Sequence, residues 1–110
     1  MNTEMNFNLE IAKRCGVREA ALATYLFKLI GNDVDYYYLN GRRWSRISQK
    51  MITVALPFMT VGMVRGSLNK LKRKGIIKSD VLNENRFDHT LWYAFTDYGE
   101  EMMDPGAYVL

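Results

Sequence analysis

The chain has 110 residues, which is enough for one ordinary domain and too few for two hydrophobic cores. With 48% hydrophobic and 25% charged residues, its composition is that of a globular chain, and it excludes disordered and membrane-embedded proteins. The longest apolar run, 51–59, contains a threonine and a proline and falls short of the roughly 20 apolar residues that a membrane span needs. The N-terminal residues have neither a basic region nor an apolar core of a signal peptide, so we expect a cytoplasmic protein without a membrane partner.

Basic side chains are concentrated in one part of the chain. The net charge is only +3, but residues 41–79 contain ten Lys or Arg and no Asp or Glu, while the rest of the chain contains five basic and twelve acidic residues. Segregation of charge in a sequence suggests segregation on the surface, although basic side chains can also be scattered over a solvated surface. Polyanions, either nucleic acid or an anionic membrane face, are the natural partners of a basic patch.

Few residues are candidates for catalysis or for metal binding. Cys15 and His89 are the only cysteine and the only histidine, so neither a thiolate cluster nor a multi-histidine site can form. The sequence has no Ser-His-Asp set and no Gly-rich phosphate loop, and the acidic pair Glu100-Glu101 lies in a polar tail. Cys15 ends a predicted helix, where a packed small hydrophobe is expected rather than a reactive thiol. We therefore expect no metal ion, no cofactor and no enzymatic activity.

The first half of the chain predicts two helices and then a turn between extended segments. Asn8 can cap a short helix that stops at Gly16, and apolar residues at helical spacing predict a second helix over 18–31. Asn40-Gly41 follows, a dipeptide that favours a tight hairpin because both of its residues accept positive φ. The flanking segments 35–39 and 42–45 predict either a small hairpin or one strand with a tight lead-in.

Two more helices are predicted in the middle of the chain. Ser48 can cap a brief helix that ends before Pro57, and Thr60 can cap a longer helix. The apolar residues of this longer helix recur at a 3-4-3 spacing that places them on one face, and they are Val61, Val64, Leu68 and Leu71. The opposite face is small, amidic and cationic, and it consists of Gly62, Gly66, Asn69, Lys70 and Arg73, with Arg65 beside it.

Two glycines inside this longer helix weaken it, because each costs roughly 0.5–1 kcal/mol relative to alanine. One explanation is that the backbone at Gly62 and Gly66 must come close to a binding partner. The other explanation is tight packing of this face against another helix. The sequence alone leaves both open.

Gly75 ends the longer helix, and two β-rich segments follow over 76–82 and 90–96. The polar connector 83–89 is too long for a tight turn, and we expect Phe87 within it to pack inward. A short helix, a turn, a longer basic helix and an antiparallel hairpin form the order of a winged helix-turn-helix, whose second helix enters the DNA major groove. The fold class expected for 1–110 is therefore mainly α with a small antiparallel β-hairpin wing, as a single winged-helix domain.

This fold assigns a DNA-binding role to side chains of three segments. Arg and Asn can each make two hydrogen bonds to a base in the major groove, whereas Lys and other Arg residues bind phosphates. Lys72 and Lys74 are instead expected to solvate the helix end and to favour its dipole. The predicted DNA-binding residues are Thr60, Gly62, Arg65, Gly66, Asn69, Lys70 and Arg73 on the longer helix, Arg43 and Arg46 on the first hairpin, and Asn85 and Arg86 at the wing tip.

Five short stretches also carry a resemblance to a known family. From Phe7 to about Phe95 the chain resembles the N-terminal winged-helix domain of phage and plasmid replication initiators of the replisome-organiser type, which is also similar to primosome proteins. The stretches are N-L-E-I-A-K-R-C-G-V-R-E-A-A-L, N-G-R-R-W, L-P-F-M-T-V-G-M-V-R, L-K-R-K-G-I-I and F-D-H-T-L-W-Y. Members of this family tend to continue into a region that engages the helicase-loading machinery.

The resemblance implies binding of double-stranded DNA at a replication origin, with replisome or helicase-loading proteins as further partners. A small transcriptional repressor would share every surface feature described so far, and a protein-interaction module could use the surface around Gly62, Met63 and Gly66 instead. Both alternatives stay open. The helix over 18–31 and the tail from Tyr98 to Leu110, with its apolar end, offer material for a homodimer.

Overall fold

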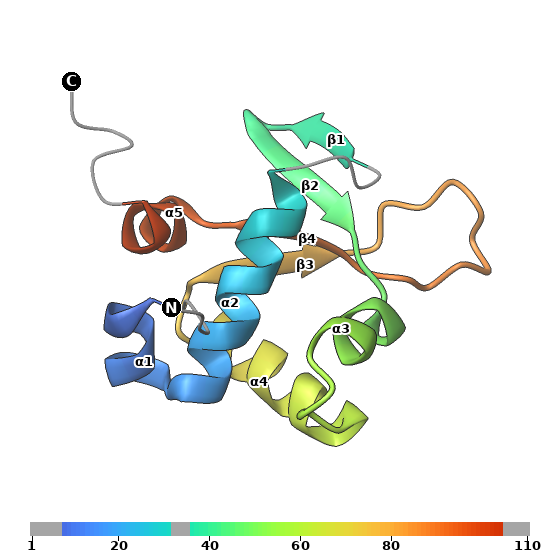
Figure 1. The fold of residues 1–110 in the computed structure, drawn as a ribbon. Coiled ribbons are helices and arrows are strands. Elements are labelled where there is room, and N and C mark those ends of the chain that lie inside the picture. The colour runs from blue at the N-terminus through green and yellow to red at the C-terminus, as the bar shows by residue number, and fades with distance from the viewer. Residues whose placement is uncertain (1–7, 32–35, 105–110) are drawn as a thin grey trace.

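The computed structural model describes residues 8–31 and 36–104. These ranges form five helices and one four-stranded antiparallel sheet (Figure 1). The helices are α1 (Leu9–Cys15), α2 (Val17–Ile30), α3 (Gln49–Ala55), α4 (Val61–Arg73) and α5 (Asp97–Met103), and the strands are β1 (Tyr36–Leu39), β2 (Arg42–Arg46), β3 (Ile77–Asp80) and β4 (Trp92–Phe95). None of the five helices has the length and apolar character needed to cross a membrane.

The predicted helix starts are confirmed by side-chain caps. The Asn8 Oδ1 accepts a hydrogen bond from the Ile11 N–H at 3.0 Å at the start of α1. The Ser48 and Thr60 hydroxyls each accept a backbone N–H three residues later, both at 3.1 Å, at the starts of α3 and α4. Each cap satisfies a donor that the first helical turn would otherwise leave unpaired.

Helix α2 is the centre of the main hydrophobic core (Figure 1). Its buried side chains recur at helical spacing and face α1, α4 and the sheet. Burial of a leucine or isoleucine stabilises the fold by about 1.5–3 kcal/mol, so this stripe is a major source of stability. The residues are Ala20, Leu22, Ala23, Leu26 and Ile30.

The predicted hairpins are both present, but they belong to one larger sheet. Asn40 and Gly41 have φ values of 55° and 73°, so the turn between β1 and β2 has the expected left-handed backbone. Strands β3 and β4 form the second hairpin, and β2 pairs with β4, which gives the order β1-β2-β4-β3. The expectation of a mainly α chain with only a small hairpin is therefore too narrow: the described chain is a mixed α/β fold, because pairing joins strands that are far apart in the sequence.

The two faces of this sheet have different surroundings. Tyr93 and Phe95 point to the helices and are almost fully buried in the main core. Trp44 and Trp92 lie on the opposite face, where they form a second, smaller cluster with Ala94. The Tyr37 ring stacks on the Trp92 ring at a centroid distance of 4.8 Å, so this aromatic cluster covers the face that the helices leave open.

Helix α5 was not among the predicted elements. Its cap is Thr96, whose hydroxyl accepts the Gly99 N–H at 2.9 Å and also donates to the Gly75 carbonyl oxygen. Gly99 packs directly on the backbone of Ile76, the residue before β3, because a Cβ added there would lie 2.0 Å from the Ile76 carbonyl oxygen. The capping threonine was present in the sequence, but the polar stretch after it masked the helical signal.

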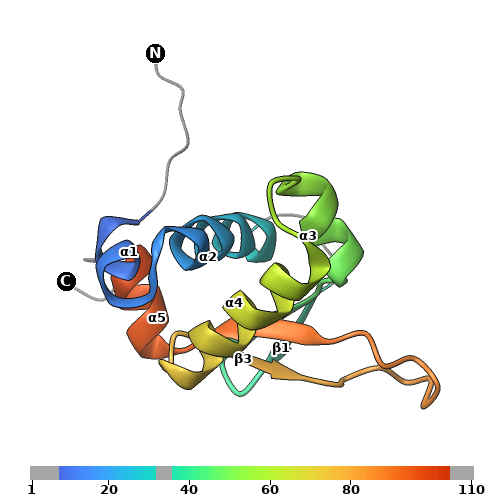
Figure 2. The same ribbon diagram turned by 90° about the horizontal axis from the view of Figure 1, so that it is seen from below.

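Helix α4 and the 83–89 loop lie at the periphery of the fold. Seen from below, α4 crosses in front of β3 and β4 (Figure 2). In both views the loop between β3 and β4 projects past the body on the side where α3 and the N-terminal end of α4 lie. These two segments are therefore available to a partner that approaches from that side.

Candidate nucleic-acid interface

Helix α4 is anchored by one face and open on the other. Val64, Leu68 and Leu71 are buried in the main core, as their spacing predicts. Ser67 is buried as well, and its hydroxyl donates a hydrogen bond of 2.6 Å to a carboxylate oxygen of Glu19 on α2. This polar anchor was not predicted, because the 3-4-3 pattern counts only apolar residues.

The exposed face of α4 carries the side chains that the sequence assigns to DNA. Gly62, Arg65, Gly66, Asn69 and Arg73 are all exposed. The side chains of Arg65, Asn69 and Arg73 make no hydrogen bond or ion pair with any other described residue. Two guanidinium groups and one amide are thus held on a fixed helix with their hydrogen-bonding groups turned to solvent.

The two glycines of α4 are not used for packing within the described chain. A Cβ added at Gly66 would meet no heavy atom within 4 Å, and one added at Gly62 would meet only the Thr60 hydroxyl, at 3.9 Å. Tight packing of this face against another helix, one of the two explanations left open by the sequence, therefore has no counterpart among residues 8–31 and 36–104. The backbone of α4 is bare at these positions.

Two residues of α4, one in its first turn and one in its last turn, differ from their predicted positions. Val61 was expected in the buried stripe, but it is 49% exposed because it belongs to the first turn, which extends past the core. Lys70 was expected on the open face, but it is half-buried and lines a cavity of about 650 Å³ together with Phe58 and Met63. The prediction for the position of these two residues is thus wrong, whereas the role of Lys70 in DNA binding stays a prediction.

Cys15 lines the same cavity and is packed, as expected. Its side chain is 2% exposed, and burial raises the pKa of its thiol above the usual value of 9.0, although the cations Lys74 and Lys70 act in the opposite direction. A raised pKa keeps the thiol protonated at neutral pH and disfavours nucleophilic chemistry.

Lys72 and Lys74 differ in what they contact. The Lys72 ammonium group donates a hydrogen bond of 3.2 Å to the Ser79 hydroxyl on β3, a contact that the expectation of a solvated helix end did not include. Lys74 is exposed at the C-cap of α4, where a cation favours the helix dipole.

The arginines of β2 are occupied by other parts of the chain. Arg42 donates to the Phe95 carbonyl oxygen and pairs with Asp97 at 2.8 Å. The Arg43 guanidinium lies over the Tyr36 ring, 3.9 Å from its centroid, and Arg46 pairs with Asp88. Acids that are absent from residues 41–79 therefore reach this strand from elsewhere in the sequence, and the roles of Arg43 and Arg46 in DNA binding stay predictions.

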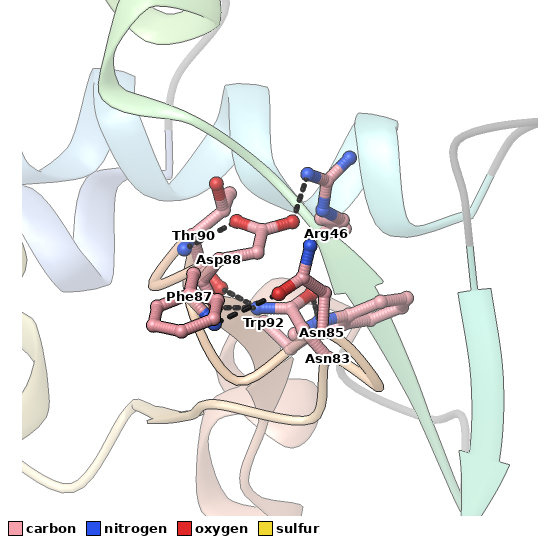
Figure 3. A network of polar contacts seen from close by, with 7 residues as sticks. All are labelled: Arg46, Asn83, Asn85, Phe87, Asp88, Thr90 and Trp92. Atoms are coloured by element: carbon pink, nitrogen blue, oxygen red, sulfur yellow. Dashed lines mark hydrogen bonds and ion pairs between the residues drawn. The ribbon is translucent and has the colours of Figure 1, made fainter.

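The 83–89 loop is held by a network of polar contacts (Figure 3). The Asn83 amide nitrogen donates to the carbonyl oxygens of Asp88 and Thr90, both at 2.8 Å, while its oxygen accepts the Trp92 indole N–H at 2.7 Å. Asp88 accepts the Thr90 N–H at 3.0 Å and pairs with Arg46 of β2. Arg46 thereby links the loop to the sheet.

This network also sets the charge of Asp88. Hydrogen bonds from Thr90, followed by the hydrogen bond and charge of Arg46, hold the pKa of the Asp88 carboxyl below its usual value of 3.8, although desolvation acts in the opposite direction. Asp88 is therefore ionised at neutral pH, and the pair with Arg46 is maintained there.

The tip of the loop presents three side chains to solvent. Asn85 and Arg86 are exposed, as predicted, and the Asn85 side-chain oxygen accepts the Phe87 N–H at 2.9 Å. Phe87 is 76% exposed, so the prediction that it packs inward is wrong. The reason is geometric: the loop projects beyond the sheet, and its bonds turn inward the polar side chains of Asn83 and Asp88 rather than this ring.

The structure describes only part of the tail that was expected to support a homodimer. The Tyr98 hydroxyl accepts a hydrogen bond of 2.8 Å from Arg14, so the start of the tail packs within the chain. Residues 105–110, which include the apolar end of the tail, lie outside the described residues. Within the described ranges no group of three or more His, Cys, Asp or Glu side chains could hold a metal ion.

Comparisons with known proteins add no further guide to the site. Neither family models, nor curated proteins, nor solved structures gave a match to the chain. The candidate interface therefore consists of what the geometry brings together: the exposed face of α4 and the tip of the 83–89 loop, with the β2 arginines engaged behind them.

Proposed function

We propose that the chain is a winged-helix protein that binds double-stranded DNA through the exposed face of α4, with the 83–89 loop as its wing. In this assignment α3 and α4 are the helix-turn-helix pair, and β2, β3 and β4 are the three strands of the wing sheet. The order α2, β2, α3, α4, β3, β4, in which β2 pairs with β4, supports it. The role is binding, with no reaction catalysed.

The observation that carries the proposal is the bare backbone of α4 between unpaired polar side chains. An α-helix fits into the DNA major groove, and the absence of side chains at Gly62 and Gly66 would let its backbone come close to the bases. Arg65 and Asn69 are four residues apart and thus lie on the same side of the helix. Arg65 is suited to guanine and Asn69 to adenine, each through two hydrogen bonds.

The resemblance to phage and plasmid replication initiators favours a replication origin as the DNA and helicase-loading proteins as later partners. A transcriptional repressor would use the same surface on different DNA. A duplex selected by the wild-type chain from DNA of its own genetic neighbourhood separates the two, since an initiator selects a site at an origin and a repressor selects a promoter.

The test of DNA binding is a titration of fluorescently labelled duplexes, one random and one selected, at several salt concentrations. Specific binding that weakens with salt is expected, because cations that bind phosphates release counterions. Arg65→Ala and Asn69→Ala should bring the affinity for the selected duplex toward that for the random one. Equal affinity of both variants and wild type for both duplexes would contradict the proposal.

A second candidate function, a protein-interaction module, is favoured by a separate observation. The surface next to the N-terminal end of α4 is apolar: Val54, Phe58 and Val61 are between 49% and 72% exposed. Phe58 and Met63 also line the cavity of about 650 Å³ near α4. Exposed apolar groups around a cavity are typical of surfaces that bind other proteins.

The two functions predict opposite effects of two substitutions. If α4 reads DNA, Arg65→Ala weakens DNA binding and Phe58→Ala leaves it unchanged. If the apolar surface is the functional one, Phe58→Ala abolishes binding of a partner helicase loader or of a second copy, and the wild-type chain does not bind DNA. Sedimentation and the duplex titration together distinguish these results.

A further inference from the structure

Phe87 is the most exposed large hydrophobic side chain in the described part of the chain, at 76%. Its neighbours in the loop are polar. The loop projects beyond the body of the fold, away from the hydrophobic core (Figure 2). Exposure of a whole aromatic ring forgoes the stabilisation that burial would give. A ring in this place is best explained by a partner that buries it.

The backbone that carries this ring is fixed. The Phe87 N–H donates to the Asn85 side-chain oxygen at 2.9 Å, and the Asp88 N–H donates to the Asn85 carbonyl oxygen at 3.0 Å. Asn83 and Asp88 tie both ends of the loop to β2 and β4 through the bonds drawn in Figure 3, whereas the Phe87 ring itself carries none of them. The backbone that carries the ring is therefore ordered, and it loses little conformational entropy when the loop binds.

The chemistry beside the ring indicates a polyanion with an apolar interior. The Arg86 guanidinium lies 5.2 Å from the centre of the Phe87 ring, so a cation accompanies the aromatic group. Arg46 neutralises Asp88, which removes one negative charge from the face that would meet a polyanion. Duplex DNA combines phosphates with a stack of apolar base faces, and the loop projects on the same side as the N-terminal end of α4.

We propose that Phe87 is a wedge that enters the DNA minor groove beside the site read by α4 and inserts between two base pairs. Insertion unstacks one base step and bends the duplex toward the major groove, while Arg86 binds the adjacent groove or phosphate. Pyrimidine–purine steps such as TA are the easiest to unstack, so the wedge selects such a step in the flank without a hydrogen bond to a base. This inference rests on the proposed DNA-binding function and extends it.

The experiment uses a duplex selected by the full wild-type chain from a random pool, with 2-aminopurine placed in turn at each position of the site. The fluorescence of 2-aminopurine rises when its base loses a stacking neighbour. With wild type at saturation, a rise is expected at one step outside the α4 contacts. Phe87→Ala should abolish that rise and weaken affinity by about tenfold or less, since unstacking opposes most of the gain from burial.

Three further variants control for other effects. Phe87→Leu keeps an apolar wedge and should retain most of the fluorescence rise. Arg86→Ala should weaken affinity but retain the rise once the duplex is saturated, because the ring is still present. Phe58→Ala removes an aromatic ring that is 51% exposed elsewhere on the surface and should change neither signal.

The outcomes separate the wedge from the function on which it rests. Binding by wild type with no fluorescence rise, or with a rise that Phe87→Ala retains, overturns the wedge and leaves DNA binding by α4 in place. Loss of the rise only in Phe58→Ala also overturns it. Absence of DNA binding by the wild-type chain overturns both proposals. A vesicle or protein that wild type binds and Phe87→Ala does not bind would then be the partner of the ring.

Discussion

The arginines of β2 have partners within the chain, whereas Arg65 and Arg73 on the exposed face of α4 have none among the described residues. Both regions lie in the same stretch without acidic residues. They differ because β2 lies inside a sheet, where the loop before β4 brings Asp88 to it and the start of α5 brings Asp97, while α4 turns one face outward. Arginine on β2 thus fixes the sheet and the loop, whereas the arginines on α4 stay open to solvent, where we propose that they bind DNA.

The largest expected effect comes from placing a bulky side chain on the bare face of α4. Gly66→Leu should weaken binding to the selected duplex by about 100-fold, because it holds the helix away from the groove and removes the contacts of both Arg65 and Asn69. The fold should not suffer, since nothing lies within 4 Å of the added Cβ and leucine favours a helix over glycine by about 0.5–1 kcal/mol.

Gly66→Ala is the matched control for this substitution. It should raise the thermal unfolding temperature as well, but it adds too little volume to block the groove and should leave most of the affinity. Fluorescence anisotropy and circular dichroism measure the two quantities. If Gly66→Leu binds the duplex as wild type does, α4 does not approach DNA closely.

The next effect is the loss of one base contact. Arg65→Ala and Asn69→Ala should each reduce affinity for the selected duplex by about 5- to 150-fold, which corresponds to about 1–3 kcal/mol per contact. Affinity for random duplex should change far less. Lys70→Ala is expected to weaken both duplexes alike, as a phosphate contact does. If Arg65→Ala lowers the affinity for both duplexes equally, Arg65 contacts a phosphate rather than a base.

On β2 the expected effect is on stability instead. Arg42→Ala removes the ion pair with Asp97 and leaves the Phe95 carbonyl oxygen without its arginine donor, so it should lower the free energy of unfolding by about 1–2 kcal/mol. DNA affinity should stay within about twofold of wild type. Asp97→Asn, at a residue with a highly exposed side chain, should destabilise by less. A large loss of DNA affinity in Arg42→Ala would remove the distinction between the two regions.

The smallest effect is a pH dependence of the loop network. The folded pKa of Asp88 lies below its usual value of 3.8, so its ionised form stabilises the fold at neutral pH, and this contribution is lost as pH falls below about 4 through the folded pKa. The unfolding temperatures of wild type and Asp88→Asn should therefore converge as the pH falls from neutral values to below about 4. A constant difference over this range would show that Asp88 contributes no charge-dependent stability.

Much of the fold follows from local signals in the sequence. The three capping residues Asn8, Ser48 and Thr60 and the turn Asn40-Gly41 lie where short-range rules place them. Each of these signals depends on residues within one turn, so a sequence pattern contains all the necessary information. Most of the exposed face of α4 was predictable for the same reason, because helical periodicity separates it from the buried face, with Val61 and Lys70 as the exceptions.

The features that were missed depend on residues far apart in the sequence. Arg46 and Asp88 are 42 positions apart, and Arg42 and Asp97 are 55 positions apart, so no local pattern reveals that these cations are paired. The pairing of β2 with β4 is likewise long-range and turned the expected small wing into a four-stranded sheet. Exposure of Phe87 depends on how far its loop projects, which composition does not encode.

The central claim, that the open face of α4 and the wing tip form a DNA-binding surface, is tested most directly by the salt dependence of binding to the selected duplex. With Lys70, Arg73 and Arg86 on phosphates, and Arg43 and Arg46 retained by the chain, log K should fall against log salt with a slope of about −3. A slope of about −4 to −5 would show that the β2 arginines also leave their partners for DNA. No binding, or a slope near zero, would contradict the account.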